Sequence, residues 1–254
     1  MFGIEIWQFW AAIAITAFAG FVKGAIGFAM PMIMLSAFGS IMPATTALAA
    51  LILPTLLTNI QQAFRQGPTE AWGSIRRFRL HISMVVIFIC VSAAFAQTIP
   101  QPVMYATLGL PIVGFALWQL SGRSMAMSVE HNKPFEAITG IIGGLYGGVS
   151  GIWGPPLIVY LLSVGVEKRE QVRVQGVVFL IGAVALTGAH LTSGLLDSRT
   201  LPLSLILCLP AFAGMLAGFA LQDRLDVVQF RRWTLVLLVL TGLNLVRRAF
   251  EIWI

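Results

Sequence analysis

Charged side chains are scarce in this sequence. Of its 254 residues only 10% are Asp, Glu, Lys or Arg, whereas 58% are hydrophobic and the mean hydropathy is +0.89. This composition lies outside the range of soluble globular domains and predicts a polytopic membrane protein. The net charge of +6 is then typical of loops that set orientation. We expect no nucleic-acid partner, because no basic cluster is interleaved with aromatic residues.

Residues that perform catalysis or bind metals are equally few. Cys90 and Cys208 both fall in apolar runs and form neither a disulfide framework nor a metal-ligand pair. The ten carboxylates lie at chain ends, in loops or at the margins of apolar runs, so no Asp or Glu relay across a membrane is expected. The phosphate-binding pattern Gly-x4-Gly-Lys-[Ser/Thr] does not occur. We therefore expect no cofactor, no metal and no ATP hydrolysis by that route.

Glycine and proline, by contrast, form a pattern that occurs twice. The stretch 20–31 has Gly at positions 20, 24 and 27 and Pro at 31, and the stretch 144–155 has Gly at 144, 148 and 151 and Pro at 155. Each stretch lies inside an apolar run, where Gly and Pro break a helix and release backbone groups that lipid cannot satisfy. Paired interrupted segments in the two halves of a membrane protein indicate a transporter's binding site.

The apolar runs form two series of the same order. A membrane span needs about 20 mostly apolar residues. We predict an all-α polytopic membrane protein of two inverted repeats, each a Gly/Pro-broken helical hairpin followed by three transmembrane helices. The predicted segments are repeat one, 1–122, with hairpin 6–38 and helices 44–64, 80–99 and 102–121; a cytoplasmic linker, 123–134; and repeat two, 135–254, with hairpin 135–164 and helices 174–194, 201–221 and 233–250.

The inversion is inferred from the positions of Lys and Arg. With both interrupted runs as hairpins and the loop 65–79 in the cytoplasm, 12 of the 16 Lys and Arg residues lie on the cytoplasmic side, as the positive-inside rule favours. If the second run crossed only once, the loops 165–173 and 222–232 would move outside and the bias would largely disappear. The first hairpin is then predicted to end outside and the second inside. The pair Arg247 and Arg248 lies outside, against the rule.

With its two Gly-rich hairpins, the run Gly-Pro-Pro at 154–156 and hydrophobic helices behind each hairpin, the chain resembles the sulfite exporter TauE/SafE family over nearly its whole length. The stretch from Leu157 through 168–170 to Gln175 belongs to the resemblance. In the first copy the family often has more glycine where this chain has Phe-Ala-Met at 28–30. The resemblance implies a multi-pass protein of the bacterial inner membrane that moves a small organic or inorganic sulfur anion of the sulfite, sulfonate or sulfoacetate class.

The two broken tips supply the first candidate substrate-binding residues. Helix N-termini there would present unpaired N–H groups and a partial positive charge to a small oxyanion. Gly24, Gly27, Gly148 and Gly151 would let the anion approach the backbone, whereas the alternative is that these glycines permit close helix packing. Lys23 is the only basic residue in either tip. It either meets the anion or extends to the membrane interface.

Polar residues on the following helices are further candidates. Asn59 and Gln175 would line a path between the hairpins, although amides in membrane helices also form hydrogen bonds between helices. Trp153 would contact the substrate or serve in packing. His190 would couple a proton near neutral pH or form a buried hydrogen bond as a neutral imidazole.

A competing interpretation belongs to a different class of protein. Gly148-Val149-Ser150-Gly151 with His190 downstream looks like the Gly-x-Ser-Gly and helix-borne His of rhomboid intramembrane serine proteases, in which His activates Ser. In the other copy Ser150 aligns with Ile26 and His190 with Phe64, whereas the glycines persist. Backbone geometry is thus the shared requirement, so we expect no enzyme and keep Ser150 as a substrate-site candidate.

The expected function is therefore transport, with membrane lipid as the surrounding partner. Each anionic charge that leaves a cell with a negative interior gains about 2.3 kcal/mol per 100 mV. Export driven by the membrane potential is the simplest hypothesis. An anion channel and a structural subunit of a larger complex are further alternatives, and the sequence indicates no oligomeric state.

Overall fold

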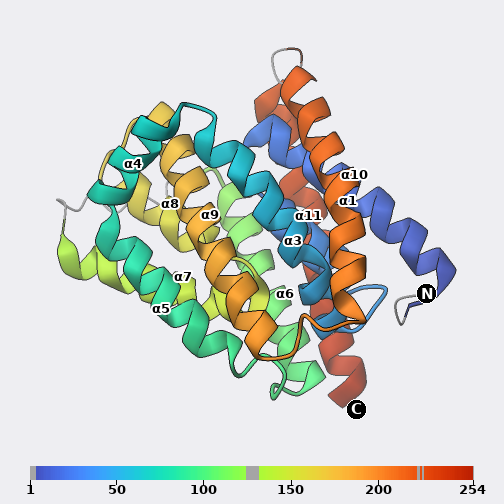
Figure 1. Cartoon of the computed structure of the whole chain (residues 1–254). Helices are drawn as coiled ribbons and strands as arrows, with labels where there is room; N and C mark the ends of the chain where they lie inside the picture. Colours follow the sequence, from blue (N-terminus) through green and yellow to red (C-terminus); the bar gives the residue numbers. More distant parts are fainter. Residues whose placement is uncertain (1–3, 124–131, 222–223, 225, 254) are drawn as a thin grey trace. The chain divides into compact units, whose positions relative to one another are not determined.

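The computed structural model describes residues 4–123, 132–221, 224 and 226–253, and all regular structure in these ranges is helical. Five helices in them, α1, α3, α6, α9 and α10, contain segments long and apolar enough to cross a membrane, so the chain is a multi-pass membrane protein. Most of the predicted linker 123–134 lies outside the described residues. The helices in order (Figure 1) are α1 (Ile6–Ile26), α2 (Met30–Phe38), α3 (Ala44–Phe64), α4 (Pro68–Arg77), α5 (Arg79–Ala93), α6 (Gln101–Leu120), α7 (Lys133–Ser150), α8 (Gly154–Ser163), α9 (Lys168–Thr192), α10 (Thr200–Leu221) and α11 (Val227–Trp253).

The last glycine of each copy ends a helix. α1 stops before Gly27, whose φ is +86°, and α7 stops before Gly151, whose φ is +70°. Glycine adopts this left-handed conformation without the steric penalty of a Cβ, which makes it the usual residue after a helix end. The next helices begin after residues 27–29 and 151–153, with a proline in the first turn of each. Both apolar runs are therefore interrupted where the Gly and Pro pattern predicts.

Gly27 offers a test of backbone strain without steric overlap. Nothing lies within 4 Å of a Cβ built on this residue, so replacement by alanine should act through the positive φ alone. We expect Gly27→Ala to lower the free energy of unfolding by about 1–2 kcal/mol. Gly27→Asn should cost less, because asparagine tolerates the left-handed conformation. Thermal unfolding in detergent compares the two variants, and an equal loss in both would contradict the conformational explanation.

The helices group into two compact units that differ from the halves of the sequence. Unit 1 holds the broken pair α1 and α2 with α6, α10 and α11, and unit 2 holds the broken pair α7 and α8 with α4, α5 and α9. The helix α3 is divided between them after Pro54, a residue that removes a backbone hydrogen bond from the helix interior. Each unit thus combines one broken pair with helices from both halves of the sequence.

Glycines hold the principal helix pair of unit 1 together. A Cβ on Gly20 would overlap the carbonyl oxygen of Ala211, and one on Gly24 would overlap that of Met215. The helix α1 therefore packs directly on the backbone of α10, as small residues permit in membrane helices. Gly20 lies against Ala211 and Gly24 lies against Met215. Residue numbers therefore increase in the same direction along both helices, so α1 and α10 are parallel.

Unit 2 repeats this arrangement with the other copy of the pattern. A Cβ on Gly144 would lie 2.7 Å from the carbonyl oxygen of Val85, and one on Gly148 would lie 2.5 Å from that of Ile89. The helix α7 accordingly lies along α5 in the same direction (Figure 1). The first two glycines of each copy therefore serve close packing, while the third glycine breaks the helix.

Arg248, which lies on the outer side in the charge count, is held by contacts inside unit 1. Its guanidinium donates a hydrogen bond to the carbonyl oxygen of Gly39 and lies 4.8 Å from the centre of the Tyr105 ring. A cation over an aromatic face is stabilised by the ring quadrupole. These contacts give Arg248 a structural role inside unit 1.

Candidate functional site

The second break, residues 151–153, lies where α7, α8 and α9 of unit 2 pack together. Its largest side chain, Trp153, is only 2% exposed. The indole meets the ring of Phe179 edge-on, with centroids 6.3 Å apart. It also lies against Gly182, where an added Cβ would come within 2.8 Å of the indole Nε1. Only glycine at position 182 leaves room for this indole.

Hydrogen-bond donors at this break are left without acceptors in the described ranges. The Nε1–H of Trp153 is buried and has no partner there. The backbone amides of Trp153 and Gly154 likewise pair with no carbonyl or side chain among those residues, and Pro155 and Pro156 have no N–H. A buried donor without an acceptor costs about 1–3 kcal/mol. A donor of this kind calls for a partner with an acceptor oxygen, such as an ordered water or a bound anion.

The two amides that precede Trp153 are already satisfied. Gly151 N–H donates to the carbonyl oxygen of Gly147 at 2.7 Å, and Ile152 N–H donates to Ser150 Oγ at 3.0 Å. The Ser150 hydroxyl in turn donates to the carbonyl oxygen of Tyr146 at 2.6 Å. Ser150 therefore shapes the turn, and the free donors begin at Trp153.

The partners of His190 bear on the protease interpretation. Its imidazole is fully buried, and Nε2 donates to the carbonyl oxygen of Gly148 at 2.8 Å, while Nδ1 lies 3.3 Å from Ser193 Oγ. These contacts do not include Ser150. A serine nucleophile requires a hydrogen bond to its base, so the observed pairing does not favour a rhomboid-like protease. His190 instead ties α9 to the backbone of α7.

The amide candidates lie on the wall of the break. Asn59 Nδ2 donates to the carbonyl oxygen of Phe179 at 2.9 Å and so joins α3 to α9, the arrangement named above as the alternative for membrane amides. Gln175 lies one helical turn before Phe179 and two turns before Gly182, on the α9 face that meets the break. Its side chain is half-buried and forms no hydrogen bond within the described ranges.

The remaining candidates, Lys23, Gly24 and Gly27, lie at the first break, in unit 1. Lys23 belongs to the last turn of α1, and its carbonyl oxygen accepts the N–H of Gly27 at 2.8 Å. The lysine is 3% exposed. It therefore does not extend to the molecular surface in the way that the interface alternative requires. The structure thus places the ten candidates at two breaks, three residues in unit 1 and seven in unit 2.

The sequence did not reveal a buried polar cluster near the start of α7. Glu136 is 3% exposed, and its Oε1 accepts the backbone N–H of His81 at 3.1 Å. The imidazole of His81 is buried and stacks on the Tyr160 ring, with centroids 5.6 Å apart. The sequence places Glu136 at the margin of an apolar run. Its burial against α5 cannot be predicted from the local sequence, because α5 is distant along the chain. Within the described ranges no group of His, Cys, Asp and Glu is arranged to hold a metal ion.

Comparison with known proteins gives one match. The family model described as sulfite exporter TauE/SafE matches residues 12–245. This range contains both breaks and most of the helices of both units. No curated protein and no solved structure matches the chain.

Proposed function

Because this chain belongs to the sulfite exporter TauE/SafE family of membrane transporters for sulfur anions, we propose that it exports a small sulfite, sulfonate or sulfoacetate anion across the bacterial inner membrane. The observation that carries this proposal is the buried, unpartnered indole N–H of Trp153 at the start of α8. A sulfur oxyanion supplies acceptor oxygens for this N–H, which has no acceptor among the described residues. The N-terminus of α8 adds a partial positive charge and two free amides.

The surrounding candidates have distinct roles in this proposal. Gly151 ends α7 so that the chain turns toward the donors, and Ser150 and His190 hold the turn through their bonds to Ile152 and Gly148. Gln175 is the side chain on the α9 face that is free to contact the anion. At the first break, Gly27 and the buried Lys23 form the corresponding anion-binding region of unit 1.

Two inverted repeats with alternating access form the second part of the proposal. The charge count directs α1 and α10 from outside to inside, and α5 and α7 from inside to outside. The parallel packing of α1 on α10 and of α7 on α5 supports this assignment. Broken hairpins that enter from opposite sides are the arrangement in which inverted-repeat transporters bind anions at interrupted helices.

Transport driven by the membrane potential gives the proposal a direct test. We expect purified protein in liposomes to take up labelled sulfite or sulfoacetate when the vesicle interior is positive, with a rate that saturates as the anion concentration rises. Uptake should fall steeply when the potential is set to zero, because each charge gains about 2.3 kcal/mol per 100 mV.

Sulfate and taurine serve as controls for this flux. Sulfate tests whether the site distinguishes sulfur anions, and taurine, which carries no net charge, should respond little to the potential. Flux of no sulfur anion through folded protein would overturn the proposal. Flux that rises linearly with concentration and never saturates would favour an anion channel instead.

A further inference from the structure

A polar cavity of about 410 Å³ lies in unit 2. Its lining consists of Arg65 and Gln66, which follow the end of α3, Glu70 in the first turn of α4, and Arg173 in the second turn of α9. The elements meet closely at this point, because an added Cβ on Gly176 would lie 2.9 Å from the backbone of Gln62. The cavity is therefore set by packed helix ends, and its volume is within the range of small-molecule sites.

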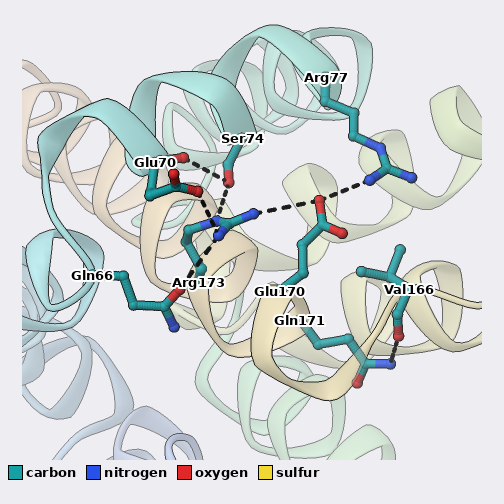
Figure 2. A network of polar contacts seen from close by, with 8 residues as sticks. All are labelled: Gln66, Glu70, Ser74, Arg77, Val166, Glu170, Gln171 and Arg173. Carbon is teal, nitrogen blue, oxygen red and sulfur yellow. Dashed lines mark hydrogen bonds and ion pairs between the residues drawn. The ribbon is translucent and has the colours of Figure 1, made fainter.

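Arg173 is the centre of the polar network around this cavity (Figure 2). Its Nη1 lies 2.9 Å from Glu70 Oε2 and its Nε donates to Ser74 Oγ at 3.0 Å. Its Nη2 lies 3.6 Å from Glu170 Oε1, an oxygen that also pairs with Arg77 at 2.8 Å. The guanidinium is thus aimed at the cavity by neighbours on both α4 and α9.

The two carboxylates of the network differ in how readily they can leave Arg173. The Glu170 side chain is 21% exposed and is held by two arginines, whereas the Glu70 side chain is 56% exposed and pairs, among the described residues, with Arg173 alone. An exposed ion pair contributes only about 0–1 kcal/mol. Although Arg173 is only 18% exposed, the Glu70 carboxylate is open to solvent and is therefore the partner that an entering anion displaces most readily.

We propose that this cavity is a binding site for a small oxyanion, which takes the place of the Glu70 carboxylate on Arg173. The planar guanidinium fork matches two oxygens of a sulfonate, sulfite or carboxylate group. Arg65 lends a second positive charge to the lining, and the Gln66 side chain, whose Oε1 accepts from Arg173 Nη1 at 3.4 Å, holds the guanidinium in place. With Glu70 displaced, the Arg173 fork meets the anion in a cavity that Arg65 also borders.

The position of Arg173 suggests what the site does. Arg173 lies nine positions before Gly182 on α9, which corresponds to about 14 Å along the helix axis. Gln175 and Phe179 lie between them in the sequence, but with Gly182 they occupy the face of α9 opposite to Arg173, so the cavity and the break are linked along the helix axis only. In the orientation proposed above, this end of α9 is cytoplasmic. The role as an entry site for export rests on the proposed function, whereas anion binding in the cavity does not.

A reactive thiol in the cavity tests the binding directly. In a background with both native cysteines replaced by serine, Glu70→Cys is treated with an anionic sulfonate-bearing methanethiosulfonate and with its cationic trimethylammonium counterpart. After division by the rate of each reagent with a free thiol in solution, we expect the anionic reagent to be favoured about tenfold, because Arg173 and Arg65 attract it; this ratio corresponds to about 1.4 kcal/mol. Free sulfoacetate should slow this reaction in a saturable manner.

Two additional substitutions, each combined with Glu70→Cys, distinguish anion binding in the cavity from a general effect of positive charge on the reaction rate. Arg173→Gln should lower the anionic rate about tenfold and abolish protection by sulfoacetate. Arg79→Gln, which removes the same charge from a nearby exposed residue outside the cavity, should leave both unchanged. Should Arg173→Gln fail to fold, Arg65→Gln, the other arginine of the lining, tests the same prediction. Absence of protection with both arginines intact, or equal losses in the Arg79 variant, would overturn the proposal.

Transport kinetics then distinguish the entry role from anion binding. We expect Arg173→Gln to raise the KM for the exported anion about tenfold and Glu70→Gln to lower it, with the maximal rate unchanged in both. Protection of the thiol without any effect on KM would retain the binding site and reject the entry role. A chain that transports no anion would reject the proposed function, while the thiol experiment would still decide whether the cavity binds one.

Discussion

Trp153→Phe is expected to raise the KM for the sulfur anion by about 10- to 100-fold with little net change in stability. Phenylalanine keeps an aromatic ring against Phe179, but it lacks the indole atoms that lie against Gly182 and leaves a small cavity there. The substitution removes the Nε1–H, which has no acceptor among the described residues. A hydrogen bond to a charged group contributes about 1.5–3 kcal/mol, and each 1.4 kcal/mol is about tenfold in affinity.

The stability of the variant is the second readout of this prediction. Removal of a buried donor that lacks an acceptor also removes its desolvation penalty, and this offsets the packing lost with the smaller ring, so the unfolding temperature should change little. Proteoliposome kinetics and thermal unfolding in detergent measure the two quantities on one preparation. Trp118→Phe, the same change at an exposed position of α6, should alter neither. A lower unfolding temperature with an unchanged KM would show that the indole N–H has a structural partner and no part in anion binding.

Gly148→Ala is expected to prevent stable folding of unit 2. Its Cβ would overlap Ser92 Oγ and lie 2.5 Å from the carbonyl oxygen of Ile89, and a backbone oxygen cannot rotate away. The helices α7 and α5 would have to separate, which strains the 3.2 Å bond from Ser92 Oγ to Gly144 and the 2.8 Å bond from His190 to Gly148. Overpacking alone costs about 1–3 kcal/mol, and the strained bonds add to it.

A second glycine provides the matched control for this substitution. Gly188, within α9 of the same unit, has nothing within 4 Å of an added Cβ. Gly188→Ala should therefore raise stability by about 0.5–1 kcal/mol, since alanine loses less chain entropy in a helix. Yield of monodisperse protein and thermal unfolding compare the two. Wild-type stability in the Gly148 variant would contradict the close approach of α7 and α5.

The paired glycines show which features of the structure could be predicted from the sequence and which could not. Gly20, Gly24 and Gly27 match Gly144, Gly148 and Gly151 in spacing, and that spacing correctly indicates an interruption in each apolar run. For Gly24, Gly27, Gly148 and Gly151 the sequence left two interpretations, approach of an anion to the backbone and close helix packing. In the structure the first two glycines of each copy pack against another helix backbone and the third ends a helix. A partner helix from distant sequence cannot be read from the local pattern.

The buried polar residues illustrate the same limit. Glu136 is a first-turn carboxylate in the sequence, and only the packing of α7 on α5 reveals that it is 3% exposed. Arg173 and Glu70 are loop-flanking charges in the sequence, and they meet because α4 packs on the start of α9. The contacts that give these residues a role join positions far apart along the chain.

The sequence by itself determined that this is a multi-pass helical membrane protein with two interrupted runs, because composition, span length and Gly/Pro spacing are local properties of the chain. The link to sulfur-anion transporters came from its resemblance to the TauE/SafE family. Only the tertiary structure decided that each broken pair packs with helices of both sequence halves, that Trp153 retains an unsatisfied donor, and that Arg173 borders a cavity. Whether a group is buried or hydrogen-bonded depends on which distant helices lie next to it. Helices become neighbours only where their side-chain volumes and backbones fit together, and this fit is a property of the packed structure.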